Sequence, residues 1–178
     1  MKDFFLRIDK YFLCKFSNIK NILLFDILSR IGHFLFCFPM ILILFLIPDI
    51  RFKEMAILSF FSMILDTLLV FIIKHSVKRK RYFKEGFYLN KVDPYSFPSG
   101  HISRLAGFIF PTMIFPIIST IFFFFSIVSS ISRMAKGYHF FSDCFFGFII
   151  GFISGFIIII NKELFINYFY LFLSFLPF

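Results

Sequence analysis

The chain has 178 residues, of which 60% are hydrophobic, and it contains 35 Phe and no Trp. Soluble domains contain about 45–50% apolar residues, so the composition excludes an ordinary soluble domain and indicates a single domain that lies in a membrane. The formal net charge is +9. On a membrane protein such a charge favours phosphorylated headgroups or anionic lipid, rather than nucleic acid, as the partner.

Residues 1–30 are too charged to cross a membrane, because lysines and arginines recur every few positions among the apolar residues. This pattern predicts an amphipathic segment, an N-terminal interfacial helix with its basic side chains toward the headgroups. We identify no cleavable signal in it, since no apolar stretch is followed by a small-residue cleavage site.

The rest of the chain predicts an all-α fold, a polytopic membrane bundle of five or six transmembrane helices. Residues 31–160 form the predicted helical core, and residues 161–178 form an apolar C-terminal tail that would supply the sixth span. The expected core spans are residues 31–48, 55–74, 101–117, 119–132 and 143–160. The third and fourth are separated where Pro116 interrupts the apolar run, because proline disfavours a helix interior.

The order of these spans places several polar residues on one face of the membrane. Lys74 ends the second span, His101 begins the third, Arg133 follows the fourth and Asp143 begins the fifth. Because successive spans alternate in direction, all four ends share one face with the basic loop 75–97.

Three of the residues at this face are cations suited to a phosphate ester. Lys74 and Arg81 are seven positions apart, so a continued helix would hold both on one side. Arg133 adds a planar donor for bidentate phosphate contact. Ser99 and Gly100 lie where the third span begins; glycine there allows close backbone approach, and a helix N-terminus offers free N–H groups to an anion.

The same face carries groups for covalent catalysis. His139 and Asp143 are four positions apart, so they share a helix face if a helix begins near Tyr138. The carboxylate would hold one ring nitrogen and leave the other free to attack phosphorus. His101 could then protonate the leaving group. We expect no cofactor and no metal, since cations stabilise the charge and carboxylates are too few for a magnesium site.

Each part of this cluster also has a structural interpretation when it is taken alone. A lysine at a helix end usually lies at the membrane interface, and Pro98-Ser99-Gly100 is an ordinary turn. We expect His33 and His75 to be structural, and Asp66, inside the second span, to make buried hydrogen bonds. Convergence of separate motifs on one face favours the catalytic interpretation.

The motifs resemble those of the type 2 phosphatidic acid phosphatase superfamily of lipid phosphatases. They are Lys74-x6-Arg81, Pro98-Ser99-Gly100-His101 and Ser132-Arg133-x5-His139-x3-Asp143. The resemblance implies that His139 is the nucleophile, His101 the acid and base, and Asp143 the residue that orients the nucleophile. It implies a phosphate-binding set of Lys74, Arg81, Ser99, Gly100 and Arg133. The chain departs from the family pattern at Tyr82, where the family usually has proline.

A narrower resemblance concerns the segment before the second motif. Val92-Asp93-Pro94-Tyr95-Ser96-Phe97, with Arg104 and Gly137-Tyr138-His139, looks like the branch of polyisoprenoid (presqualene) diphosphate phosphatases. This resemblance implies isoprenoid diphosphates as the favoured substrates, with phosphatidate as the alternative. It implies an endoplasmic reticulum or nuclear envelope membrane in a eukaryote; in a bacterium we expect the plasma membrane.

The leading hypothesis is therefore a membrane lipid phosphatase that releases phosphate from a lipid mono- or diphosphate through a phosphohistidine. A lipid phosphoryl or headgroup transferase with the same site, and a non-catalytic headgroup-binding protein, are the alternatives. All Lys and Arg residues except Arg51, Lys53 and Lys162 fall on the predicted catalytic side. The positive-inside rule therefore predicts that this side is cytosolic.

Overall fold

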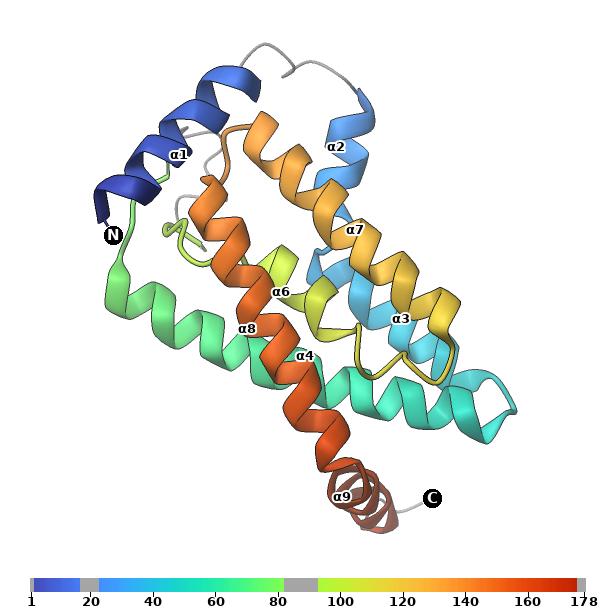
Figure 1. Ribbon diagram of the computed structural model, residues 1–178. Helices are drawn as coiled ribbons and strands as arrows, with labels where there is room; N and C mark the ends of the chain where they lie inside the picture. Colours follow the sequence, from blue (N-terminus) through green and yellow to red (C-terminus); the bar gives the residue numbers. More distant parts are fainter. Residues whose placement is uncertain (1, 17–22, 82–92, 176–178) are drawn as a thin grey trace.

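The computed structural model describes residues 2–16, 23–81 and 93–175 (Figure 1). Regular structure in these ranges is helical, apart from one isolated bridge between Lys80 and Tyr95. The expected all-α class is confirmed. The helices are α1 (Lys2–Phe16), α2 (Leu23–Arg30), α3 (Phe34–Leu46), α4 (Ile50–Val77), α6 (Gly100–Gly107), α7 (Pro116–Ala135), α8 (Phe141–Ile160) and α9 (Lys162–Ser174).

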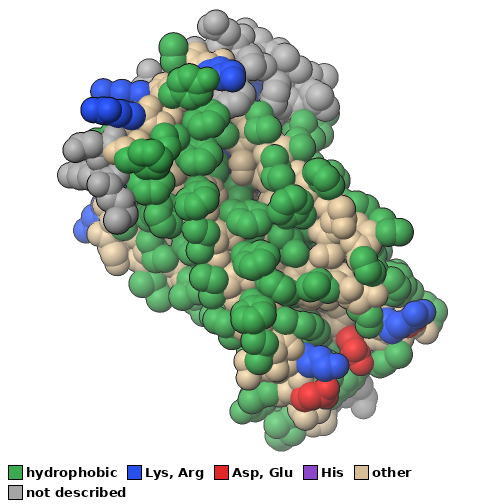
Figure 2. Space-filling view, in the orientation of Figure 1, with side chains coloured by type: hydrophobic (Ala, Val, Ile, Leu, Met, Phe, Trp, Pro, Cys, Tyr) green, Lys and Arg blue, Asp and Glu red, His purple; other side chains and the backbone are tan. Residues whose placement is uncertain are grey.

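Three of the described helices, α4, α7 and α8, are long and apolar enough to cross a membrane. The apolar helix α3 is shorter, with 13 residues. Hydrophobic side chains cover the middle of the face in Figure 2, and charged side chains lie toward its two ends. An apolar band between charged ends is the surface expected of a bundle that lies in lipid.

The boundaries of several expected segments differ from the sequence prediction. The interfacial segment 1–30 contains two helices, α1 and α2, rather than one. The expected third span, 101–117, is not one helix, because α6 ends at Gly107 and turns follow as far as residue 115. The expected turn after Pro116 is wrong: Pro116 is the first residue of α7, where its missing N–H costs no hydrogen bond. The sixth span at the C-terminus stays a prediction.

The short helix α6 lies at the centre of the bundle and packs most closely on α8 (Figure 1). Gly147, Gly151 and Gly155 recur every fourth residue on the face of α8 that meets α6. A side chain at any of the three would collide with α6 backbone, and at Gly151 the first obstacle is the Ser103 carbonyl. Small residues at this spacing let two membrane helices approach closely. The approach brings the Ser99 N–H within 2.9 Å of the Asp143 carbonyl oxygen.

Buried hydrogen bonds also join α4 to α6, further along α6 from its contact with Asp143. Ser103 Oγ donates to Asp66 Oδ2 at 3.0 Å, and Ser62 Oγ donates to the Gly107 carbonyl at 2.8 Å. Asp66 is fully buried. The expectation that Asp66 makes buried hydrogen bonds is confirmed, as the cost of placing a polar group in lipid requires.

Two residues named in the sequence analysis, Tyr82 and Val92, lie outside the described residues. Nothing in the structure therefore bears on the departure from the family pattern at Tyr82.

The contact between α8 and α6 yields a stability prediction. We expect Gly151→Ala to lower the free energy of unfolding by about 1–3 kcal/mol, because the new methyl group forces the two backbones apart. Thermal unfolding in detergent measures the effect. Ile153→Ala, on the lipid-facing side of the same helix, is the control and should unfold close to the wild type. Unfolding of Gly151→Ala at the wild-type temperature would contradict the close approach.

Candidate active site

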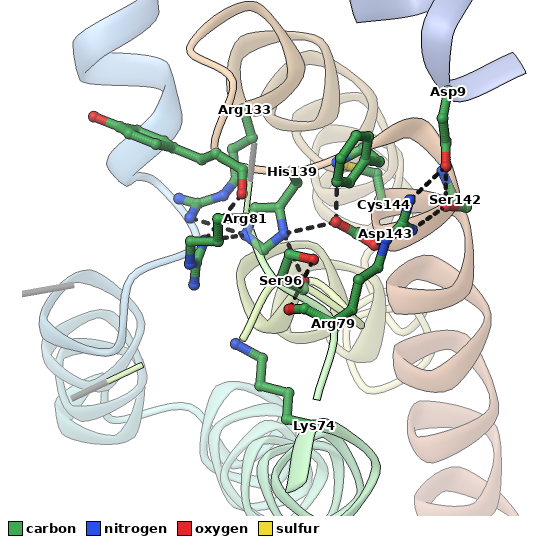
Figure 3. Close-up of polar contacts among 12 residues, drawn as sticks. Asp9, Lys74, Arg79, Arg81, Ser96, Arg133, His139, Ser142, Asp143 and Cys144 are labelled. Carbon is green, nitrogen blue, oxygen red and sulfur yellow. Dashed lines mark hydrogen bonds and ion pairs between the residues drawn. The ribbon is translucent and has the colours of Figure 1, made fainter. Parts of the chain in front are cut away.

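Four helix ends bring the predicted site residues together, and Figure 3 shows Lys74, Arg133 and Asp143 among them. Lys74 lies in the last turn of α4, and Arg133 lies in the last turn of α7. His101 is the second residue of α6, and Asp143 lies in the first turn of α8. The structure therefore places these four residues at one end of the bundle, as the order of the spans predicts.

His139 lies in the connection between α7 and α8 and is buried. Its Nδ1 is 2.8 Å from the Ser96 carbonyl oxygen. Because a carbonyl only accepts, Nδ1 carries the proton and Nε2 carries a lone pair. Nε2 lies 3.3 Å from Arg81 Nη1 and 3.1 Å from Arg133 Nη2. Two guanidinium groups therefore lie next to the unprotonated Nε2.

The surroundings of His139 keep its ring neutral. Burial, and after it the charges of Arg133 and Arg81, lower the pKa of His139 well below its ordinary value of 6.5. A neutral imidazole with a lone pair on Nε2 is the form that can attack an electrophile. The hydrogen bonds of the ring and its lowered pKa thus both favour the neutral imidazole with its lone pair on Nε2.

Asp143 is held on both of its oxygens. Oδ2 accepts the Phe140 N–H at 2.9 Å, and Oδ1 accepts from Arg79 Nη1 at 2.7 Å. Oδ2 is 3.6 Å from His139 Nδ1, which is too long for a hydrogen bond. The Ser96 carbonyl thus holds the ring, and Asp143 lies beside it as a fixed negative charge.

Two conditions that the sequence analysis attached to the local geometry are not met. The helix that contains Asp143 does not begin near Tyr138: α8 begins at Phe141, so His139 precedes it. α4 does not continue to Arg81 either, because it ends at Val77 and the next residue adopts a left-handed backbone with φ 51°. Arg81 reaches the site from beyond the helix, where it also donates to the Tyr138 carbonyl at 3.1 Å.

Asp93 is a member of the site that sequence reasoning missed. Its carboxylate lies 2.6 Å from Lys74 Nζ and 2.8 Å from Arg81 Nη2, so it bridges two of the three cations expected to bind phosphate. The sequence analysis named Asp93 only within the segment 92–97 that carries the narrower resemblance and gave it no role in the site. Its position next to the second motif is the one signal that could have drawn attention to it.

The second motif forms the start of α6. Ser99 is the N-cap residue, and its buried Oγ has no hydrogen-bond partner among the described residues. A side chain on Gly100 would lie 3.4 Å from the Val70 side chain of α4, which is an ordinary contact distance. The ring of His101 lies 5.5 Å from the ring of His33, measured between centroids.

A pocket of about 560 Å³ extends from this cluster. Lys74, His101 and Arg133 line one part of it, and Phe34 and Phe71 contribute apolar side chains. His33 and Arg104 also line the pocket.

His33 therefore belongs to the pocket although no motif contains it. One contact of His33 agrees with the expected structural role: its Nδ1 accepts the Leu35 N–H and so caps the start of α3. Nothing in the sequence near His33 indicates its proximity to His101.

Comparison with known proteins agrees with this geometry. A family model described as the PAP2 superfamily matches residues 55–165. The structure of LpxE from Aquifex aeolicus is 25% identical, with a TM-score of 0.67 over 82% of this chain and 91% of that one. The structure of a transmembrane PAP2-type phosphatidylglycerolphosphate phosphatase from Bacillus subtilis is 22% identical, with a TM-score of 0.68 over 87% of this chain and 84% of that one.

The matched residues make up more than half of the chain. They include all three motifs and the residues that surround His139. The chain belongs to the PAP2 superfamily, whose helical membrane fold it has.

Proposed function

We propose that the protein is an integral membrane lipid phosphatase that hydrolyses a lipid mono- or diphosphate through a phosphohistidine at His139. The observation that carries the proposal is the lone pair of His139 Nε2 between Arg81 and Arg133. A phosphoryl group placed there would have its phosphorus facing a nucleophile and its oxygens facing fixed cations. Phosphoryl transfer depends chiefly on such positioning and charge stabilisation.

Binding would exchange one set of ionic contacts for another. In the structure the Asp93 carboxylate forms ion pairs with Lys74 and Arg81. A phosphate dianion would displace this carboxylate and take over both cations, while Arg133 binds a further oxygen. The ion pairs with Asp93 thus keep the cations neutralised until an anion of higher charge arrives.

The first chemical step forms a bond from His139 Nε2 to phosphorus and breaks the bond from phosphorus to the leaving oxygen. His101 donates a proton to that oxygen. The proton on Nδ1 stays on the ring, with the Ser96 carbonyl as its acceptor. The ring becomes positively charged as a result, and the carboxylate of Asp143 beside it stabilises that charge.

The second step hydrolyses the phosphohistidine. His101, now neutral, accepts a proton from a water molecule whose oxygen attacks phosphorus. The phosphorus–nitrogen bond breaks, its electron pair returns to Nε2, and inorganic phosphate leaves. His101 is then protonated for the next cycle. The side chains and the attacking water supply every proton, and the side chains supply every stabilising charge, so no step in the scheme requires a cofactor or metal.

The pocket supports a lipid substrate with a terminal phosphate. Its apolar side chains, Phe34 and Phe71, would contact the first part of a lipid chain. His33 and Arg104 would provide donors for a second phosphate, which favours an isoprenoid diphosphate. Phosphatidate is the alternative substrate. The cytosolic orientation of the site stays a prediction.

The nucleophile can be tested by replacing it. We expect His139→Ala to reduce phosphate release from farnesyl diphosphate and phosphatidate by on the order of a thousand-fold or more, with EDTA present throughout. Tyr170→Ala, which removes an exposed ring of α9 outside this pocket, is the control and should retain activity. Survival of activity in His139→Ala, or loss of wild-type activity in EDTA with recovery on adding Mg²⁺, would contradict the scheme.

The pKa of His139 determines the acid side of the pH profile. The nucleophile must be neutral, and a lowered pKa keeps it neutral to lower pH, so kcat/KM should fall only below pH 6.5. Arg133→Gln removes a charge that lowers this pKa and should move the fall to higher pH.

The charge-preserving variant Arg133→Lys is the control, and its fall should stay near the wild-type position. Ionisation of the substrate is common to all three proteins, so the difference between profiles reports the enzyme. Coincident profiles for the two variants would be incompatible with an effect of this charge on His139.

Removal of the Asp93 carboxylate should strengthen the binding of product-like anions. We expect Asp93→Asn to lower the inhibition constant of inorganic phosphate by about tenfold, since phosphate need no longer displace a carboxylate from two cations. Glu163→Gln, which removes an exposed carboxylate paired with Lys162, controls for net charge. An unchanged or higher constant in Asp93→Asn would argue against displacement.

A further inference from the structure

Two charged residues that the proposed chemistry does not use form an ion pair beside Asp143. Asp9 belongs to α1 and is 3% exposed. Its Oδ2 lies 2.7 Å from Arg79 Nη2, and the other terminal nitrogen of Arg79 lies 2.7 Å from Asp143 Oδ1 (Figure 3). The guanidinium therefore bridges a carboxylate of the N-terminal helix and the carboxylate next to His139.

Asp9 also caps helix α8. The N-cap residue of α8 is Phe140, whose side chain has no hydrogen-bond acceptor. The Ser142 N–H donates to Asp9 Oδ1 at 3.0 Å, and Ser142 Oγ donates to Asp9 Oδ2 at 2.8 Å. A carboxylate from α1 thus satisfies a backbone N–H at the start of α8 and lies favourably at the positive end of that helix.

Several contacts hold the Arg79 guanidinium in place. Its Cζ lies 4.0 Å from the centroid of the Phe140 ring, and its Nη1 also donates to Ser142 Oγ at 2.6 Å. A planar guanidinium between two carboxylates and an aromatic face has little freedom to rotate. Loss of the Asp9 charge would remove the ion pair that holds Arg79 Nη2, the guanidinium nitrogen that points away from Asp143.

Aromatic packing attaches α1 to the same end of α8. The rings of Phe12 and Phe141 stack with centroids 4.9 Å apart, and those of Phe5 and Phe146 lie 5.6 Å apart. Phe4 and Tyr11 remain exposed on α1. The helix that the sequence predicts to lie in the interface is thus joined to the helix that begins at the site.

We propose that Asp9 is a positioning residue of the active site: through Arg79 and Ser142 it fixes the carboxylate of Asp143 beside His139. The inference rests on the proposed function, in which His139 becomes positively charged during phosphoryl transfer. A fixed carboxylate stabilises that charge without reorganisation, whereas a mobile one does not. The N-terminal helix is therefore part of the catalytic assembly.

The test uses the full-length chain in lipid nanodiscs. Asp9→Asn keeps the size of the side chain and an oxygen for the Ser142 N–H but removes the charge that holds Arg79. We expect kcat to fall roughly tenfold to a hundredfold with KM within about twofold of the wild type, because a charge-assisted contact is lost. Asp9→Glu should recover part of kcat.

Asp49 offers a matched control. It caps helix α4 by accepting the Arg51 N–H at 2.9 Å, and its carboxylate pairs with the Arg51 guanidinium at 2.8 Å. It therefore has the same chemistry as Asp9, but it lies at the opposite end of α4 from Lys74. We expect Asp49→Asn to leave kcat unchanged.

A double-mutant cycle separates positioning from general destabilisation. If Asp9 acts through Asp143, Asp9→Asn should have no further effect on kcat in an Asp143→Asn background. An equal fall in both backgrounds, or a wild-type kcat in Asp9→Asn, would overturn the proposal. If thermal unfolding shows that Asp9→Asn does not fold, Arg79→Lys replaces it in the same cycle, since lysine keeps the charge but not the fork.

A second readout does not require activity. The ¹³C resonance of the His139 ring, assigned with His139→Ala, should shift in Asp9→Asn and not in Asp49→Asn. If the wild-type protein releases no phosphate from any substrate, a shift in Asp9→Asn would uphold the positioning role and reject the proposed function. An unshifted resonance would reject the positioning role, whatever the activity.

Discussion

The hydrogen bond from His139 Nδ1 to the Ser96 carbonyl is the interaction on which the site depends. It places the proton on one ring nitrogen and so the lone pair on the other. Arg81 and Arg133 can only donate, so both of their contacts to Nε2 require that lone pair. The Ser96 carbonyl oxygen therefore keeps Nε2 unprotonated, and this allows both guanidinium groups to lie next to the nucleophile.

That backbone oxygen is held by the packing of the whole bundle. The small residues of α8 let α6 approach, and the Ser99 N–H then meets the Asp143 carbonyl. The loop that carries Ser96 is thereby joined to the helix that begins beside His139. In lipid an unpaired charge is costly. Arg79 and Lys74, among the described residues of the site, each pair with a carboxylate.

The sequence was sufficient for the fold class and for the convergence of Lys74, His101, Arg133 and Asp143, because both follow from hydropathy and the order of the spans. It was insufficient where one residue's conformation or a distant partner decides the geometry. The left-handed backbone at position 78 is unusual for a lysine, so nothing marked the end of α4 before Arg81. The predicted span 143–160 agrees with α8, Phe141–Ile160, but periodicity does not reveal the cap that another helix supplies. Asp9 and Ser142, whose contact joins α1 to α8, are 133 positions apart.

The bridge that Asp93 makes between Lys74 and Arg81 also bears on selection among lipids. A carboxylate carries one negative charge, and so does the phosphodiester of an ordinary phospholipid, which gains little by displacing it. A terminal phosphate carries close to two charges and more free oxygens, so it competes better for the same cations. In the proposed function, Asp93 thus discriminates between the abundant diesters of the bilayer and the scarce substrate. The discrimination depends on headgroup charge: only a headgroup with more negative charge than the Asp93 carboxylate displaces it readily. The apolar walls of the pocket cannot distinguish one lipid chain from another.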